Sequence, residues 1–456
     1  MPIDRRSVLS AGFAAGLGTA AAAGPRPDAK LAYAEGARAS AAELGLEPGA
    51  PTDQSHALQK AIDEAANRKV PLMLPPGRFR SGALQLRPGL RLIGAAGTTV
   101  LEFAGGQTFL VGESADDILL EALTIDGAYK MLDPDHADGL VCLRTCRGVH
   151  LRNLDVSRSI SNAISLQASS GSIGDCAVAG AMQAGIRSLD ASGLEILHNA
   201  VVDCANNGIQ VWRSEAGEDG TVVSGNRIQR IRADSGGTGQ NGNGVNVFRS
   251  GGVLVSGNRI SDCAYSAVRG NAASDMQIIA NSCARLGEVA LYAEFGFQGA
   301  LIANNLVDRA ATGISVTNFN DGGRLAIVQG NLLRNLFRRE HEPEDKRGNG
   351  IAVEADTAVN GNVIENAPAA GIVIGWGAYM RQVTATGNLL RKVRVGILMS
   401  SDPTAAGGCL LANNMIAEAG DGGIRAMDGS GEPVGPDLAR TQSGDARLSV
   451  SGNMVV

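Results

Sequence analysis

The stretch VSGNRI occurs twice, at Val223–Ile228 and at Val255–Ile260, and the related VSGNMV returns at Val450–Val455. In each copy an alternating apolar segment leads into an Asn and a further apolar pair. This setting recurs about 22 to 39 residues apart, at Asn153, Asp175, Asn199, Asn226, Asn258, Asn281, Asn305, Asn331, Asn362, Asn388, Asn414 and Asn453. Self-similarity at such a period predicts a solenoid of stacked repeats.

A second strand pattern follows each Asn, as in NGIQVW, TGISV and NGIAVE. Its apolar residues alternate with period two, and no segment of helical period separates it from the next repeat. Strands without crossover helices must pair with the equivalent strands of neighbouring repeats, which predicts a parallel β-helix. We expect the Asn to adopt a left-handed turn and to bond to the Asn of the next coil, a structural role rather than a catalytic one.

The N-terminus has the pattern of an export signal. Arg5-Arg6 precedes an apolar run rich in Ala and Gly that ends near Ala23. This arrangement is typical of a twin-arginine signal peptide. We therefore expect a signal peptide at 1–24, a linker at 25–50 and one β-helix domain at 51–456, in which 51–110 form the N-terminal cap and first coils. The twin-arginine translocase would be a partner during export, and the protein would be periplasmic or secreted.

Composition limits the partners that we expect. The net charge is −6, and the basic residues form no cluster, which argues against nucleic acid as a ligand. Beyond the signal, no apolar run is long enough to span a bilayer, so a stable membrane anchor is not expected. The seven cysteines lie mostly in or beside apolar repeat segments, so buried thiols are favoured over a disulfide framework.

An amphipathic helix is predicted at 52–68, before the repeats. Ala57, Leu58, Ala61, Ile62 and Ala65 fall on one stripe, with Thr52 as the expected N-cap. Such a helix would cover the open end of the solenoid, where unpaired strand edges invite association with other chains.

The run DQSHALQKAIDEAANRKVPLMLPPGRF resembles the N-terminal cap of pectate-lyase-like proteins, and the later repeats resemble their right-handed coils. With the paired arginines, the chain is also similar to an uncharacterised family of twin-arginine-translocated repeat proteins. The resemblance implies an all-β, right-handed parallel β-helix with an N-terminal capping helix. It also implies a polysaccharide or other glycan as partner, and a polysaccharide lyase or C5 epimerase acting on a uronan-type glycan. The alternatives are a non-catalytic glycan-binding or envelope scaffold protein, and an inverting glycoside hydrolase.

The segment DPDHADG at 133–139 resembles the Asp-Pro-His-Asp motif of periplasmic alginate epimerases, with extra residues inserted. That resemblance makes His136 a candidate base and Asp138 a candidate catalytic residue. The alternative is a polar turn that leads into a strand. The spacing also suggests a calcium loop, but no bidentate acid follows at the expected interval, so Ca²⁺ stays open. No organic cofactor motif is present.

A candidate binding strip follows the outward residues of the second strand in successive coils. It mixes aromatic, amide and charged side chains, which suits a sugar polymer. The expected substrate-binding residues are Gln210, Trp212, Arg213, Asn246, Phe248, Arg269, Tyr292, Asn318 and Trp376. Two insertions, before Val245 and before Ile351, should wall this strip. The alternative is that a loop buries Trp212 and Phe248.

Glu294, Glu354 and Arg249 are the candidate catalytic residues on this strip. Glu294 and Glu354 fall in one column two coils apart, about 9–10 Å, which approaches the acid–base separation of inverting glycosidases. Arg249 could neutralise a uronate while a base removes its C5 proton. The alternative is that these acids are simply solvated.

Overall fold

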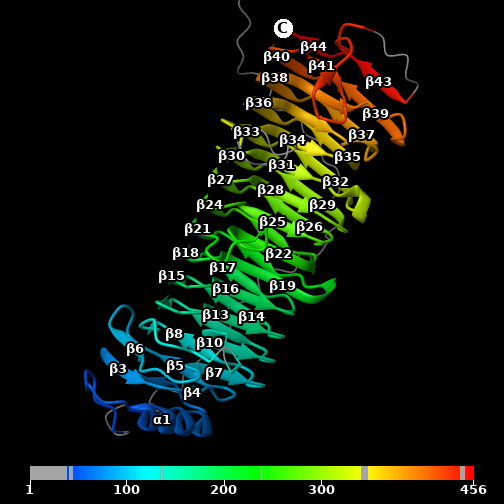
Figure 1. Cartoon of the computed structure of the whole chain (residues 1–456). Coiled ribbons are helices and arrows are strands. Elements are labelled where there is room, and N and C mark those ends of the chain that lie inside the picture. Colours follow the sequence, from blue (N-terminus) through cyan, green and yellow to red (C-terminus); the bar gives the residue numbers. More distant parts are fainter. Residues whose placement is uncertain are drawn as a thin grey trace, which may run out of the picture. The chain divides into compact units, whose positions relative to one another are not determined.

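The computed structural model describes residues 39–40, 45–133, 135–136, 138–237, 239–339, 348–441 and 447–456. These residues form a parallel β-helix whose coils stack along one axis (Figure 1). The predicted signal peptide at 1–24 and most of the predicted linker at 25–50 lie outside the described residues. Residues 39–40 pair with a solenoid strand, so the strand stack begins within the stretch predicted as a linker.

Each coil contributes strands to three faces, which we call A, B and C. Face A is a 16-stranded sheet. Its strands, in spatial order, are β1 (Ala39–Ser40), β2 (Leu72–Met73), β5 (Arg91–Ile93), β8 (Leu119–Glu121), β11 (Val149–Arg152), β14 (Gly171–Gly174), β17 (Glu195–Leu197), β20 (Val222–Ser224), β23 (Leu254–Ser256), β26 (Met276–Ile279), β29 (Gln298–Ala303), β32 (Arg324–Gln329), β35 (Ala355–Asn360), β37 (Arg381–Thr386), β39 (Gly407–Ala412) and β43 (Leu448–Ser451).

Face B follows face A along each coil and is built from short strands. They are β3 (Gly77–Ser81), β6 (Thr99–Phe103), β9 (Thr124–Asp126), β12 (Asp155–Ser157), β15 (Ala177–Ala179), β18 (Ala200–Val202), β21 (Arg227–Ile231), β24 (Arg259–Cys263), β27 (Ser282–Leu286), β30 (Leu306–Asp308), β33 (Leu332–Arg334), the first parts of β36 (Val363–Ile374) and β38 (Leu389–Ser400), β40 (Met415–Ala419) and β44 (Met454–Val455).

Face C contains the second strand pattern of each repeat. Its strands are β4 (Leu84–Gln85), β7 (Leu110–Glu113), β10 (Gly139–Arg144), β13 (Asn162–Gln167), β16 (Ala184–Leu189), β19 (Asn207–Glu218), β22 (Asn243–Gly251), β25 (Val268–Asn271), β28 (Val289–Glu294), β31 (Thr312–Val316), β34 (Asn349–Val353), the later parts of β36 and β38, and β41 (Ile424–Met427). Here β42 (Pro433–Val434) folds back antiparallel onto β41.

Alternation within each strand sends one set of side chains into the coil. On face C, Ile164, Ile186, Ile209 and Val245 lie in register and are fully buried. Aliphatic side chains stack at this spacing of about 4.8 Å between paired strands and exclude water along the axis. The apolar alternation in the sequence therefore becomes one continuous core.

The recurring Asn forms a buried ladder between faces A and B. In each step the backbone N–H of one Asn donates to Oδ1 of the Asn in the next coil at 2.8–3.0 Å, and its Nδ2 donates to the same oxygen at 2.9–3.0 Å. Nδ2 also donates to a carbonyl of the preceding coil, as from Asn305 to Ile278. The predicted ladder is confirmed from Asn199 to Asn453.

Two details of the ladder prediction are wrong. The left-handed residue is the one before the ladder position, as with Gly225 (φ 69°) and Asn304 (φ 57°). Asn153 and Asp175 themselves occupy this left-handed position, with φ of 51° and 56°. The ladder position in their coils is taken by the following residue, such as Cys176, whose N–H donates to Asn199 Oδ1. Sequence spacing alone did not separate these adjacent positions.

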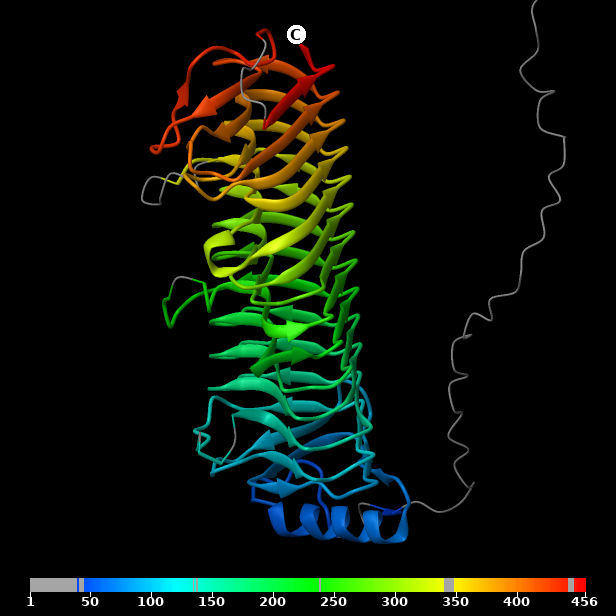
Figure 2. The same cartoon turned by 90° about the vertical axis from the view of Figure 1, so that its right-hand side faces the viewer.

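Helix α1 (Ser55–Arg68) lies across the N-terminal end of the stack (Figures 1 and 2). The predicted stripe is confirmed, because Leu58, Ala61, Ile62 and Ala65 are fully buried. The predicted N-cap, Thr52, is wrong: the helix begins after Gln54, and the Asp53 carboxylate accepts the Ser55 N–H at 2.7 Å. The helix packs against β1–β5 and so covers the first coil.

Three segments join faces B and C by more than a short turn: 127–138, 232–242 and 335–348. Their described parts leave the stack on one side and flank face C (Figure 2). Residues 340–347 of the second predicted insertion lie outside the described residues.

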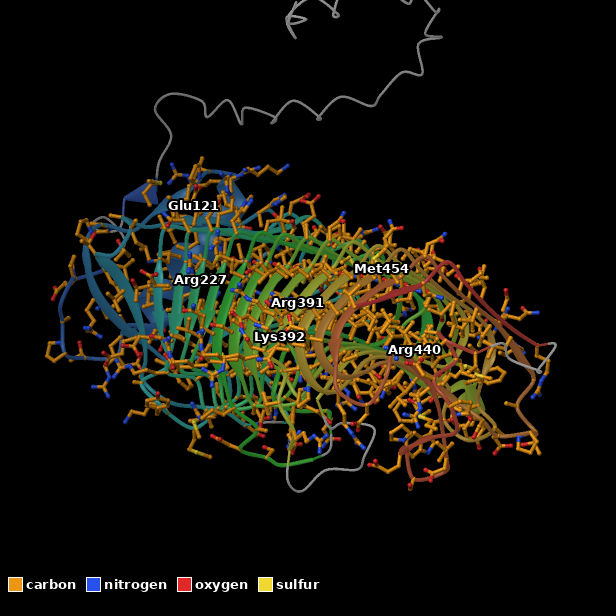
Figure 3. All side chains as sticks on the ribbon, turned by 90° about the horizontal axis from the view of Figure 1, so that it is seen from above. Glu121, Arg227, Arg391, Lys392, Arg440 and Met454 are labelled. Atoms are coloured by element: carbon orange, nitrogen blue, oxygen red, sulfur yellow. The ribbon has the colours of Figure 1, made fainter. Side chains whose placement is uncertain are left out.

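The outside of face B carries charged side chains, including Arg227, Arg391 and Lys392 (Figure 3). Arg391 donates to Glu365 at 2.8 Å and to Glu418 at 2.9 Å on the neighbouring coils. Exposed pairs of this kind contribute about 0–1 kcal/mol each, so they add little to the stability of the stack.

All seven cysteines are buried, as the sequence predicted. No helix in the described part of the chain is long and apolar enough to cross a membrane.

Replacing Asn305 with Ala should destabilise the solenoid. The change leaves the buried N–H and Nδ2 of Asn281 without their acceptor, at a cost of about 1–3 kcal/mol for each group. Chemical denaturation measures the loss. Asn304→Gly is the matched control, because Gly adopts the left-handed conformation of this exposed neighbour readily. Equal stability of N305A and N304G would contradict the structural role of the ladder.

Candidate functional site

A cavity of about 440 Å³ lies on the outside of face C, toward the C-terminal half of the stack. Its floor is apolar, because Ala352, Val373 and Leu398 point outward from successive strands into the cavity. The remaining lining residues are Val289, Tyr292, Ser315, Thr317, Asn318, Asn320, Arg338, Asn349, Val353, Glu354, Ala369, Gly375, Trp376, Tyr379, Arg394, Met427, Gly431 and Glu432. A volume of this size falls in the range of small-ligand sites.

Two aromatic residues form one wall of the cavity. Trp376 and Tyr379 are joined by a pair of backbone hydrogen bonds in the turn that follows β36. The turn is anchored from the next coil, where Ser400 Oγ donates to the Gly377 carbonyl at 2.6 Å. Trp376 packs against the apolar floor, and Tyr379 is 42% exposed. An aromatic face held over an apolar floor suits the C–H face of a sugar ring.

Charged groups stand beside the aromatic wall. Glu354 Oε2 accepts the Phe319 N–H at 2.7 Å, which ties the short 3₁₀ turn Phe319–Asp321 to the residue that follows β34. Arg394 donates to Glu432 and to Asp421, each at 2.6 Å. Those two carboxylates raise the pKa of Arg394 above its usual value. The cavity therefore presents carboxylate and guanidinium groups within a largely apolar surface.

A buried ionic cluster closes the N-terminal end of the cavity. Arg269 donates to both oxygens of Glu294, at 2.7 and 2.9 Å, and to Glu288 at 3.2 Å. Burial alone would lower the pKa of Arg269, but the charges of Glu294 and Glu288 outweigh it and raise that pKa. The Arg269 guanidinium also lies 4.9 Å from the centre of the Tyr292 ring. Burial, together with the Glu294 charge, raises the pKa of the Tyr292 hydroxyl.

The excursion 232–242 packs directly on this cluster. A Cβ on Gly239 would lie 2.1 Å from Arg269 Cζ, so only glycine fits over the guanidinium. The Gly239 carbonyl accepts from Asn246 Nδ2 at 3.2 Å. Arg269 is 6% exposed and Glu294 2%, although both point outward from face C. The predicted insertion therefore lies over this part of the strip and covers its side chains.

Four of the residues predicted from the sequence line the cavity: Tyr292, Asn318, Glu354 and Trp376. Strand pairing confirms the register of the strip, in which Gln210, Asn246, Arg269 and Tyr292 are neighbours. Glu294 and Glu354 lie two coils apart along it, and Glu294 is held by Arg269 and Asn271.

Five of the other predicted binding residues, together with the catalytic candidate Arg249, form a separate patch nearer the N-terminus. Trp212 and Phe248 are partly exposed, with their ring centres 6.0 Å apart, and Trp212 Nε1 donates to Asn246. Arg249 lies over Phe248 and donates to the Ser214 carbonyl, and Arg213 donates to the Ala191 carbonyl. Gln210 is buried. None of these six residues is among the cavity lining.

His136 and Asp138 lie six strands before β28 on the same ladder, about 29 Å from the cavity along the axis. His136 Nδ1 lies 2.8 Å from Asp133, and Asp138 is paired with Arg187. No group of three His, Cys, Asp or Glu residues in the described ranges could hold a metal ion. Pro134 and Ala137 of this segment lie outside the described residues.

Sequence reasoning missed Arg338, Tyr379, Arg394 and Glu432 as lining residues. Tyr379 could have been found, since it follows Trp376 in a short turn after the strand pattern. Arg338 lies in the noted insertion. Arg394 and Glu432 carried no local signal, because they meet only through the hairpin after β41.

Two family descriptions match the sequence. Residues 216–390 match the right-handed β-helix region, and residues 133–285 match the periplasmic copper-binding protein NosD. With the coil geometry, these matches support a right-handed parallel β-helix fold. No curated protein sequence matches the chain.

Solved structures of other proteins are similar to this chain to different degrees. A PL6 alginate lyase in complex with a trisaccharide has 12% identity and a TM-score of 0.51, and the match covers 90% of this chain and 94% of the other. The GH87 α-1,3-glucanase of Streptomyces thermodiastaticus strain HF3-3 has 15% identity and a TM-score of 0.49, covering 92% and 69%. Gene product 12 of bacteriophage phi29 has 14% identity and a TM-score of 0.47, covering 85% of this chain. This chain spans 55% of the length of that phage protein.

Replacing Glu294 with Gln should lower the free energy of unfolding by about 3 kcal/mol or more, because it leaves the Arg269 charge under-compensated in a buried site. Glu113→Gln is the control: Glu113 is 63% exposed and pairs with Arg144 at 3.0 Å, so its loss should cost less than about 1 kcal/mol. Denaturant titration compares the two variants. Equal stability would show that the cluster does not hold this part of the strip.

Proposed function

We propose that the protein is an exported, carbohydrate-active β-helix protein that binds a uronate-containing glycan in the face C cavity. The finer proposal is a polysaccharide lyase or C5 epimerase. The observation that carries it is the combination of Trp376 and Tyr379 over an apolar floor, with guanidinium and carboxylate groups beside them. Aromatic faces stack on sugar rings, while charged groups select acidic substituents and fix their orientation.

The chemistry that suits these groups begins at the carbon next to the uronate carboxylate. A cation such as Arg338 would neutralise that carboxylate and stabilise the charge that develops when a base takes the C5 proton. Glu354 is the carboxylate that we assign as this base. In elimination, the C5 electrons form the C4–C5 double bond, the C4–O bond breaks and the leaving oxygen takes a proton. In epimerisation, a proton returns to C5 from the opposite face.

Fold similarity supports this choice of chemistry only in general terms. The PL6 relative is described as an alginate lyase, and alginate is an acidic polysaccharide. Paired-acid hydrolysis by Glu294 and Glu354 has less support, because Arg269 and Asn271 already occupy the oxygens of Glu294.

Export is proposed on the Arg5-Arg6 signal, with the twin-arginine translocase as the route, and the periplasmic NosD match agrees with it. We do not propose copper binding. The cysteines of the stretch that matches NosD are buried. No candidate cluster of three ligands occurs among its described residues.

Non-catalytic glycan binding is the second candidate. It is favoured by Arg394, whose charge is already balanced by Asp421 and Glu432 and is therefore less available to a reacting uronate. Binding and turnover experiments separate the two candidates.

Trp376→Ala should weaken binding of a uronate oligosaccharide by about tenfold, the equivalent of one lost stacking contact of about 1.4 kcal/mol. The chain has two tryptophans, and Trp212→Ala is the matched control outside the cavity. Titration calorimetry gives both affinities, and melting curves confirm that each variant is folded. If W212A loses affinity and W376A retains it, the ligand occupies the other patch.

Glu354→Gln should reduce turnover by about 10²–10⁴-fold while binding changes only a few-fold, because Gln keeps an acceptor for the Phe319 N–H but cannot take a proton. Elimination is followed by the ultraviolet absorbance of the unsaturated product, and epimerisation by incorporation of solvent deuterium at C5. Glu365→Gln, on face B and paired with Arg391, is the control. Full activity of E354Q would remove Glu354 as the base. Binding without turnover in the unmodified protein would favour the non-catalytic candidate.

A further inference from the structure

The cavity is closed at both ends along the solenoid axis. Its lining runs from Tyr292 on β28 to Met427 on β41, five strand spacings or about 24 Å. An open groove for a long polymer would continue along face C beyond these strands. The outward positions that continue it are instead filled by protein.

The N-terminal end is plugged by the Arg269 cluster. In the register of the strip, Arg269 directly precedes Tyr292, and its guanidinium is packed against the Tyr292 ring and bound to Glu294. Gly239 also packs on this guanidinium, without room even for a methyl group. A chain passing here would have to displace both the ion pairs and the 232–242 excursion.

The C-terminal end is closed by the hairpin after β41. Strand β42 folds back on β41, so that Met427 pairs with Pro433 and is 2% exposed. The hairpin tip brings Gly431 and Glu432 to the cavity, and Glu432 binds Arg394 at 2.6 Å. Among the described residues β41 is the last parallel strand of face C, and only the antiparallel β42 pairs beyond it, so the regular outward strip does not continue on this side.

We propose that the cavity takes the end of a glycan chain, or a short oligosaccharide, and not the middle of a polymer. The proposal rests on glycan binding at this site. A volume of about 440 Å³ with two blocked ends accommodates a few sugar units, and the rest of a longer chain leaves through the open side. A catalytic form of the protein would accordingly release products from chain ends.

The test uses the purified full chain with a size series of uronate oligosaccharides, from the disaccharide to the hexasaccharide, and with the parent polyuronate before and after partial fragmentation at constant mass. Calorimetry should show that affinity increases with oligosaccharide length only over the shortest members of the series. It should also show one protein bound per glycan chain at every length. Fragmentation should raise the polymer's binding capacity in proportion to the number of new ends. A capacity that follows total mass and does not change on fragmentation would overturn the inference while leaving glycan binding intact.

Absence of binding to every uronate probe would instead overturn the proposed function, and this inference with it. The variant Glu432→Ala frees the hairpin tip from Arg394 and should shift preference toward the polymer, giving more than one protein per long chain. Glu418→Ala, an exposed glutamate bound to Arg391 on face B, should leave the length preference unchanged. An identical length preference in E432A and the unmodified protein would show that the hairpin does not close the site.

Discussion

The structure depends on the requirement that every coil find hydrogen-bond partners in the coils above and below it. The Asn ladder makes this requirement most visible, because the side-chain amide of each member from Asn199 to Asn453 accepts a turn N–H of the preceding coil and donates to a carbonyl of that coil. A buried polar group without a partner is costly, so the ladder fixes where one coil must sit on the next. Once that register is fixed, the inward aliphatic columns and the outward strip of face C follow from strand alternation.

A solenoid normally leaves its outward strips in solvent, and face C departs from this expectation. The excursion 232–242 packs on the outward side chains, and Arg269 and Glu294 are as buried as core residues. Burial of these charges is tolerated because Arg269 pairs with both Glu294 and Glu288. The same coverage divides the strip into a partly exposed aromatic patch at Trp212 and Phe248 and the cavity at Trp376.

The cavity combines two features that rarely arise from a repeat alone. Its apolar floor comes from regular outward positions, such as Val373 and Leu398, and therefore belongs to the repeat. Its aromatic and charged walls come from irregular turns, namely those at Trp376–Tyr379, at Phe319–Asp321 and in the hairpin that holds Glu432. The solenoid supplies a rigid base, and nonrepeating segments supply the groups that could recognise a ligand.

The sequence by itself determined the parallel stack, the Asn ladder, the capping helix stripe and the register that aligns Gln210, Asn246, Arg269 and Tyr292. These features depend on local periodicity, since alternation and turn residues act over a few positions and then repeat. The sequence did not distinguish the ladder position from the left-handed position before it, and so Asn153 and Asp175 were assigned to the wrong one. Only the tertiary structure decided that Glu294 is neutralised by Arg269, that Gly239 covers the strip and that Arg394 meets Glu432. Those contacts join segments that do not repeat, and their geometry depends on how each excursion packs across face C.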